Sequence, residues 1–157
     1  MMDFATSKSR PTILLVEDEQ NDARLFKRAL SRAGVQNSVE HLERGDTALA
    51  YLKGIGAYAD RERYPMPVLI ILDLKLPGLS GLELLHWIRL QKPLRRIPVL
   101  VLTSESSDTY MEAAYDAGAN SYLLKSFSPN EMDRVVSLIT QYWLALNESP
   151  MLMKRAS

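Results

Sequence analysis

The stretch from Val68 to Gly81, V-L-I-I-L-D-L-K-L-P-G-L-S-G, constrains the fold more than any other part of the chain. Its first five residues are apolar and run without a polar break into Asp73, after which Pro77 and Gly78 turn the chain. Such a run predicts a strand buried on both faces, as in a parallel sheet covered by helices. A buried helix could show the same run, but its length, its β-branched residues and the Pro/Gly stop favour a strand. Asp73 would then lie at the carboxyl end of the strand, where open α/β sheets place their sites; alternatively it starts a turn or caps a helix.

Strand-like runs and helical patterns alternate along the whole chain. The predicted strands are Thr12–Val16, Ser38–Leu42, Val68–Leu72, Ile97–Leu102 and Asn120–Leu124. The predicted helices run from Asn21 or Asp22 to about Arg32, over a short segment after Gly45-Asp46, and over Gly81–Leu90, Asp108–Ala117 and Pro129–Leu146. Gly54 to Pro67 is a long connection, of the kind that is usually functional or mobile. This alternation predicts a doubly wound α/β fold, a five-stranded parallel sheet with helices on both faces.

Composition narrows the classes of protein. The chain has 157 residues, which suggests one domain, and 46% of them are hydrophobic. Lys+Arg and Asp+Glu number 19 each, which argues against nucleic acid or a membrane as the main partner. Cysteine is absent, so disulfides and cysteine zinc sites are excluded, and a cytoplasmic location fits. No run is long enough to span a membrane and the N-terminus lacks a signal-peptide core. We divide the chain into a flexible lead-in (1–10), one domain (11–146) and a tail (147–157).

Polar side chains follow four of the predicted strands. They are Glu17 and Asp18, then Asp73, Thr103 and Lys125. In a doubly wound sheet these strand ends converge on one crevice. Carboxylates within roughly 5 Å of one another repel by about 3 kcal/mol per pair at an effective dielectric near 20, and a divalent cation offsets that cost. Oxygen ligands without histidine favour Mg²⁺ over zinc. With a hydroxyl and an ammonium, the set forms an electrostatic clamp for a phosphoryl group in transfer.

The motifs L-L-V-E-D-E, L-D-L-K-L-P-G-L-S-G, V-L-V-L-T-S and S-Y-L-L-K stand in this order and spacing. From about Pro11 to Leu146 the chain therefore resembles the receiver domain of two-component response regulators, which has a flavodoxin-like fold. The resemblance implies that Asp73 accepts phosphate from a phosphohistidine of a sensor histidine kinase. It implies that Glu17 and Asp18 hold Mg²⁺, together with the backbone carbonyl of Lys75.

The resemblance also assigns roles around the phosphoryl group. Thr103 would hydrogen-bond it, Lys125 would pair with it, and Tyr122 matches an aromatic switch that turns inward when Thr103 moves. Tyr122 could instead be a plain core aromatic. Lys75 and Glu105 match positions that influence dephosphorylation, and their opposite charges predict an ion pair across the mouth of the site. Alternatively, both side chains point into solvent and never meet.

The long connection and the ending Y-W-L-A-L-N-E-S-P resemble the single-domain regulators that serve bacterial phytochromes. We therefore expect a phytochrome kinase as partner and a symmetric homodimer through the Asp108–Ala117 helix, the last strand and the last helix. Tyr142, Trp143 and Leu146 look surplus to the core and would form part of this interface. Tyr142 and Trp143 could equally be core residues that finish the helix.

Two positions depart from the family pattern. Glu17 stands where many receivers have Asp, and it should still bind metal. Ser126 follows Lys125 where the family has proline after a cis bond; because a non-proline cis bond costs about 2.5–4 kcal/mol, the geometry there is open. His41 and His86 lack companion ligands, and we interpret both as structural.

Two other functions fit parts of the pattern. A Mg²⁺-dependent phosphohydrolase would also form an aspartyl phosphate; enzymes of the haloacid dehalogenase type, however, carry a second Asp two residues after the nucleophile, where this chain has Lys75. A degenerate receiver could serve as a scaffold, but the intact Asp73, Thr103 and Lys125 argue against it.

Overall fold

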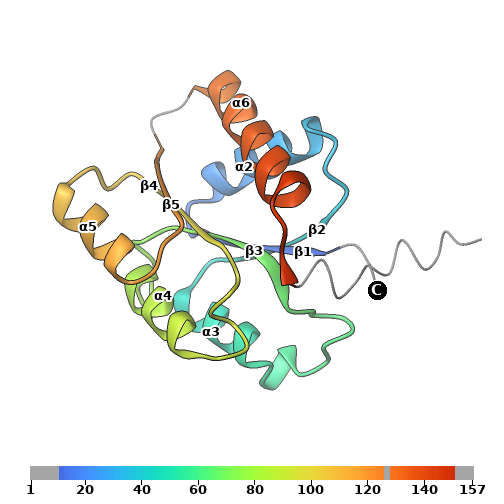
Figure 1. Ribbon diagram of the computed structural model, residues 1–157, viewed down its shortest axis with the longest axis vertical. Helices are drawn as coiled ribbons and strands as arrows, with labels where there is room; N and C mark the ends of the chain where they lie inside the picture. Colours follow the sequence, from blue (N-terminus) through green and yellow to red (C-terminus); the bar gives the residue numbers. More distant parts are fainter. Residues whose placement is uncertain (1–10, 126–127, 151–157) are drawn as a thin grey trace, which may run out of the picture.

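The computed structural model describes residues 11–125 and 128–150 and contains a parallel sheet between two layers of helices (Figure 1). Its strands are β1 (Thr12–Val16), β2 (Ser38–Leu42), β3 (Pro67–Leu72), β4 (Val99–Thr103) and β5 (Ser121–Leu124). Its α-helices are α2 (Gln20–Arg32), α3 (Gly45–Lys53), α4 (Gly81–Leu90), α5 (Asp108–Asp116) and α6 (Pro129–Thr140). The strand order is β2-β1-β3-β4-β5 and every pair is parallel. The predicted doubly wound fold is confirmed.

Hydrophobic cores pack on both faces of the sheet. Helices α2 and α6 cover one face, while α3, α4 and α5 cover the other (Figure 1). Residues of β3 alternate between them: Leu69 and Ile71 face the α2/α6 core, whereas Ile70 and Leu72 face the α3/α4 core. Because both faces of β1 and β3 are covered, all their residues are buried. This explains the unbroken apolar runs in the sequence.

Glycine is required where α3 begins. Gly45 lies so close to the loop before α4 that an added Cβ would be 1.7 Å from the carbonyl oxygen of Leu79. The backbone of Gly45 also donates a hydrogen bond to the carbonyl of Pro77. The helix therefore starts at Gly45 itself rather than after Asp46, and its first turn holds the Pro77–Gly78 turn in place.

The connection from α3 to β3 packs onto the domain. The Arg61 guanidinium donates to the carbonyl oxygens of Tyr51 and Leu52 at 2.8 Å and of Tyr64 at 3.1 Å. It thus binds carbonyl groups left open at the end of α3. The rings of Tyr51, Tyr58 and Tyr64 pack against one another with centroids 5.1–6.0 Å apart. Length alone had suggested a functional or mobile loop, but these contacts give it a structural role.

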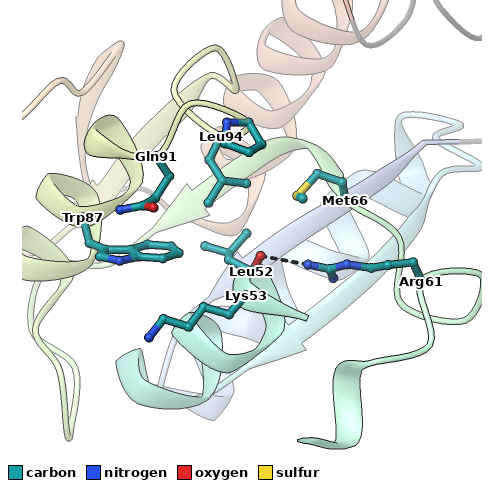
Figure 2. A pocket seen from close by; sticks show the side chains of 8 residues that line it. Leu52, Lys53, Arg61, Met66, Trp87, Gln91 and Leu94 are labelled. Carbon is teal, nitrogen blue, oxygen red and sulfur yellow. Dashed lines mark hydrogen bonds between the residues drawn. The ribbon is translucent and has the colours of Figure 1, made fainter. Parts of the chain in front are cut away.

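A pocket of about 390 Å³ lies where this connection meets the ends of α3 and α4 (Figure 2). Leu52, Met66 and Leu94 give the pocket an apolar lining, and Trp87 and Lys53 lie on one side of it. Because Met66 directly precedes β3, the pocket lies at the amino edge of the sheet. It is therefore separate from the polar groups at the carboxyl edge.

The last helix differs from the prediction of one α-helix from Pro129 to Leu146. Regular α-helix ends at Thr140, and a wider π-helical segment, η2, continues over Gln141–Leu146. Its five-residue spacing is shown by the Asn147 amide, which donates to the Tyr142 carbonyl at 2.6 Å. Among the described residues, no helix is both long and apolar enough to cross a membrane.

Candidate functional site

The carboxyl ends of the strands bring the predicted polar residues together. Glu17 and Asp18 follow β1, and Asp73 follows β3, its neighbour in the sheet. The sheet hydrogen bonding reaches into this region, because the Asp73 amide donates to the Val16 carbonyl at 3.1 Å. On the other side of β3, Thr103 ends β4, and the Lys125 amide donates to its carbonyl at 2.8 Å. The convergence therefore follows from the strand order.

Three carboxylates lie close enough to share a cation. One oxygen from each of Glu17, Asp18 and Asp73 lies within 4.8 Å of the others. Glu17 and Asp73 are 3% and 7% exposed, whereas Asp18 is exposed. Burial raises the pKa of Glu17 to about 7, and the charge of Asp73 adds to the shift, while hydrogen bonding to Lys125 opposes it. The cluster is short of positive charge, and its oxygen donors suit a hard divalent cation.

Lys125 supplies positive charge to the same cluster. Its Nζ lies 2.6 Å from Glu17 Oε1, 2.8 Å from Asp73 Oδ2 and 3.0 Å from Asp22 Oδ2. Burial alone would lower the pKa of Lys125, but hydrogen bonds to Asp73 and Glu17 outweigh it and the pKa is raised. The side chain is therefore an ammonium that bridges three carboxylates.

Asp22 was not among the predicted site residues. It had been considered only as a place where the helix could begin. The helix begins earlier, at Gln20, so Asp22 falls in its first turn. That turn directly follows the acidic end of β1 and brings Asp22 to Lys125. The position of Asp22 shortly after Glu17 and Asp18 could have indicated a place near the site. Its contact with Lys125, however, depends on the residue at which α2 begins.

The two oxygens of Asp73 have different partners. Oδ1 accepts a hydrogen bond from the Leu74 amide at 2.7 Å, and Oδ2 faces Lys125. Thr103 is 1% exposed, and its Oγ1 accepts from the Glu105 amide at 3.3 Å. The carboxylate of Asp73 is thus fixed by a main-chain donor and an ammonium, with a hydroxyl at the next strand end.

Tyr122 lies against the loop that follows Thr103. It is half-buried, and its hydroxyl donates to the carbonyl oxygen of Glu105 at 2.7 Å. Burial raises the pKa of this phenol, so it remains protonated and can donate. Tyr122 also packs beside the small core of Leu74, Val101 and Ala114. Its ring is therefore part of the packing, while its hydroxyl bonds a loop of the site; its role as a switch stays a prediction.

Lys75 and Glu105 form an ion pair between two loops that leave the strand ends of the site. Lys75 Nζ forms an ion pair with Glu105 Oε1, and the two side chains are 66% and 17% exposed. The alternative in which both point into solvent is therefore not what the structure shows. The ion pair joins the loop after β3 to the loop after β4. Its effect on dephosphorylation stays a prediction.

The remaining predicted residues lie elsewhere. Tyr142 and Leu146 are 50% and 74% exposed on η2, whereas Trp143 packs against the α2/α6 core. This favours the core alternative for Trp143. His41 Nε2 lies 2.8 Å from the carbonyl oxygen of Glu17, a main-chain contact compatible with a structural role. The Lys125–Ser126 bond lies outside the described residues.

Comparison with known proteins identifies the family of this chain and several relatives. A family model described as the response regulator receiver domain matches residues 13–137. The chain is 41% identical over 138 residues to the probable methanogenesis regulatory protein FilR2 of Methanothrix harundinacea, covering 88% of this chain and 86% of that protein. It is 38% identical over 132 residues to the response regulator Rcp1 of Synechocystis sp., covering 84% of this chain and 88% of Rcp1.

The solved structures that superpose on this chain are also response regulators. The phosphorylated cyanobacterial phytochrome response regulator RcpA superposes with a TM-score of 0.84 at 35% identity, covering 90% of this chain and 99% of RcpA. The Mn²⁺-bound form of Rcp1 superposes with a TM-score of 0.81 at 36% identity, covering 89% and 99%. That form and the acidic cluster here together support a divalent cation site. The chain therefore belongs to the response regulator receiver domain family and is a phosphoacceptor signalling protein rather than a conventional enzyme.

Proposed function

We propose that Asp73 accepts a phosphoryl group from a phosphohistidine of a sensor histidine kinase, with Mg²⁺ bound beside it. The observation that carries this proposal is the contact of Asp73 Oδ2 with the Lys125 ammonium at 2.8 Å, next to Glu17 and Asp18. Such a carboxylate is a nucleophile with a cation poised beside the group that it would attack. The intact cluster counts against a scaffold role.

The step itself is a displacement at phosphorus. An Asp73 oxygen forms the new O–P bond while the P–N bond to the donor imidazole breaks and its electron pair returns to the nitrogen. Lys125 and Thr103 would then stabilise the phosphoryl oxygens through an ammonium and a hydroxyl. Mg²⁺, when bound, would neutralise charge on the transferring oxygens. The residues that would hold it are Glu17, Asp18, Asp73 and the carbonyl of Lys75.

The ligand chemistry suits a hard divalent cation, and we propose Mg²⁺ as that ion. Carboxylate and carbonyl oxygens suit Mg²⁺ and Mn²⁺ equally in kind, and an imidazole or thiolate that would favour another metal is not part of the acidic cluster. Glu17 has a longer side chain than Asp. Its Oε2 accepts a hydrogen bond from the Glu19 amide at 3.1 Å, which restrains the side chain within the cluster. We propose that this contact lets Glu serve where many receivers have Asp.

The output would be a change in protein contacts. The Tyr122 hydroxyl donates a hydrogen bond to the carbonyl of Glu105, which lies in the loop after Thr103. Because Tyr122 belongs to β5, a movement of this loop would change the surface formed by α5 and β5. Similarity to RcpA, a phytochrome response regulator, supports a phytochrome as the kinase. We propose that phosphorylation alters how this surface meets its partners.

Asp73 should be the only site of phosphorylation. Asp73→Asn replaces the nucleophilic carboxylate with a neutral amide and should abolish uptake from radiolabelled acetyl phosphate in the presence of Mg²⁺. Asp116→Asn, at an exposed position of α5, is the matched control and should label like the wild type. Normal labelling of Asp73→Asn would show that the assignment is wrong.

We further propose that the Lys75–Glu105 ion pair hinders loss of the phosphoryl group. Water must approach in line with the bond to Asp73, and the pair, which joins the loops after Asp73 and Thr103, would lie across that path. We call this ion pair the lid. Partly exposed ion pairs contribute about 0–1 kcal/mol, and about 1.4 kcal/mol corresponds to a tenfold change in rate. The lid should therefore slow hydrolysis of the aspartyl phosphate several-fold at most.

The lid is tested by phosphate loss from the purified phosphoprotein. Lys75→Ala and Glu105→Ala should each speed the loss several-fold, and the double variant should add little more, because either change opens the same contact. High salt should speed the wild type towards the variants, since exposed charges are screened. Additive effects, or unchanged rates in all three variants, would count against the lid.

We also propose that a second copy of the chain covers an exposed apolar stripe on α6 and η2. Leu138, Tyr142 and Leu146 follow one another at four-residue intervals and are 52%, 50% and 74% exposed. Four residues are close to one turn of the α-helix and also of the wider π-helix, so the three side chains lie on roughly the same side. A self-complementary stripe suits a symmetric dimer, in which the same patch meets itself. The predicted contribution of the α5–β5 surface belongs to this proposal as well.

Leu146→Glu should convert the dimer to a folded monomer in sedimentation velocity, because it places a charge in the stripe. Gln141→Glu adds the same charge at a neighbouring exposed position and should leave the dimer intact. Trp143 is a poorer choice, because its packing against the core would confound association with stability. The dimer proposal would be wrong if the wild type is monomeric at high concentration, or if Leu146→Glu sediments with the same mass as the wild type.

A further inference from the structure

Asp22 is the one partner of Lys125 that stands outside the acidic cluster formed by the described residues. That cluster consists of Glu17, Asp18 and Asp73. Asp22 instead lies in the first turn of α2, and its Oδ2 is 3.0 Å from Lys125 Nζ. Its side chain is 34% exposed, compared with 3% for Glu17 and 8% for Asp73. Asp22 thus faces the ammonium from the solvent side of the site.

Lys125 contacts two of the carboxylates that would hold the cation. Its Nζ is in contact with Glu17 Oε1 at 2.6 Å and with Asp73 Oδ2 at 2.8 Å. A divalent cation held by the same carboxylates would repel the ammonium and draw these oxygens away from it. The lysine must then be retained by something else, or it would leave the place where a phosphoryl group needs it.

We propose that Asp22 is a positioning residue that retains the Lys125 ammonium beside Asp73 when a divalent cation takes the carboxylates of the cluster. The proposal rests on the proposed function, since it assigns Lys125 to the phosphoryl group. Two features fit this role. The backbone of Asp22 is held in α2, outside the acidic cluster, and its carboxylate is close enough to Lys125 for a direct ion pair. The chemistry needs only a carboxylate at this position.

The simpler alternative is that Asp22 only stabilises α2. An acidic residue in the first turn interacts favourably with the helix dipole, and its replacement would then lower stability without affecting Lys125. The two roles separate in a measurement that observes the ammonium itself. The ¹H–¹⁵N signal of a lysine ammonium is visible only where hydrogen bonds protect it from exchange with water, and Lys125→Arg identifies the signal of Lys125.

The test compares wild type, Asp22→Asn and Asp133→Asn without and with saturating Mg²⁺. Asp133 is the matched control, because its side chain is 30% exposed, close to the 34% of Asp22, and it forms an ion pair with Arg32 at 2.8 Å, away from the site. We expect the Lys125 signal to persist with Mg²⁺ in wild type and Asp133→Asn, and to be lost with Mg²⁺ in Asp22→Asn. Asp22→Glu should restore it in part, because a carboxylate is kept.

Phosphorylation by acetyl phosphate at saturating Mg²⁺ should slow by about two- to fivefold in Asp22→Asn, the range that a partly exposed ion pair converts to. A signal that survives Mg²⁺ in Asp22→Asn, or that Mg²⁺ removes from the wild type, would overturn the role of Asp22. These signals do not depend on phosphate transfer. A wild type that takes up no phosphate would therefore defeat the proposed function, while the ammonium signal would still decide the role of Asp22.

Discussion

The ammonium of Lys125 lies among the carboxylates of Glu17, Asp22 and Asp73, and the chemistry of the site depends on this contact. One positive charge faces three carboxylates here, with a fourth on Asp18 nearby. Burial raises the pKa of Glu17 to about 7, and the charge of Asp73 adds to this shift. A cluster with this imbalance favours cations, and a phosphoryl group can enter it only together with them.

The fold supplies this contact through strand order. Buried strands β1 and β3 are neighbours, so their carboxyl ends deliver the acids side by side, while β4 and β5 deliver Thr103 and Lys125 from the other side. Helices pack against these strands on both faces of the sheet. The loops beyond the strand ends carry the remaining polar groups of the site. Two contacts tie them together, the Lys75–Glu105 ion pair and the hydrogen bond from Tyr122 to the Glu105 carbonyl.

Much of this was predictable because the signals were local. Continuous apolar runs identified the buried strands, and the polar residue after each run identified the site. Features that depend on packing were not predictable in the same way. The contact of Asp22 with Lys125 depends on α2 starting at Gln20. The change to a π-helix after Thr140 is not marked in the sequence by a Pro or Gly. Whether Lys75 meets Glu105, and whether Trp143 faces the core, depends on loop paths and helix rotation that spacing leaves open.

The most direct test of this account is the intact mass of the protein after incubation with acetyl phosphate, with Mg²⁺ or with a chelator. We expect the mass of one phosphoryl group to be added when Mg²⁺ is present, to persist after the donor is removed, and to be absent when the chelator is present. No added mass with Mg²⁺ would contradict a phosphoacceptor role. Rapid turnover of the donor without accumulation would indicate a hydrolase, and equal uptake in the chelator would contradict the cation site.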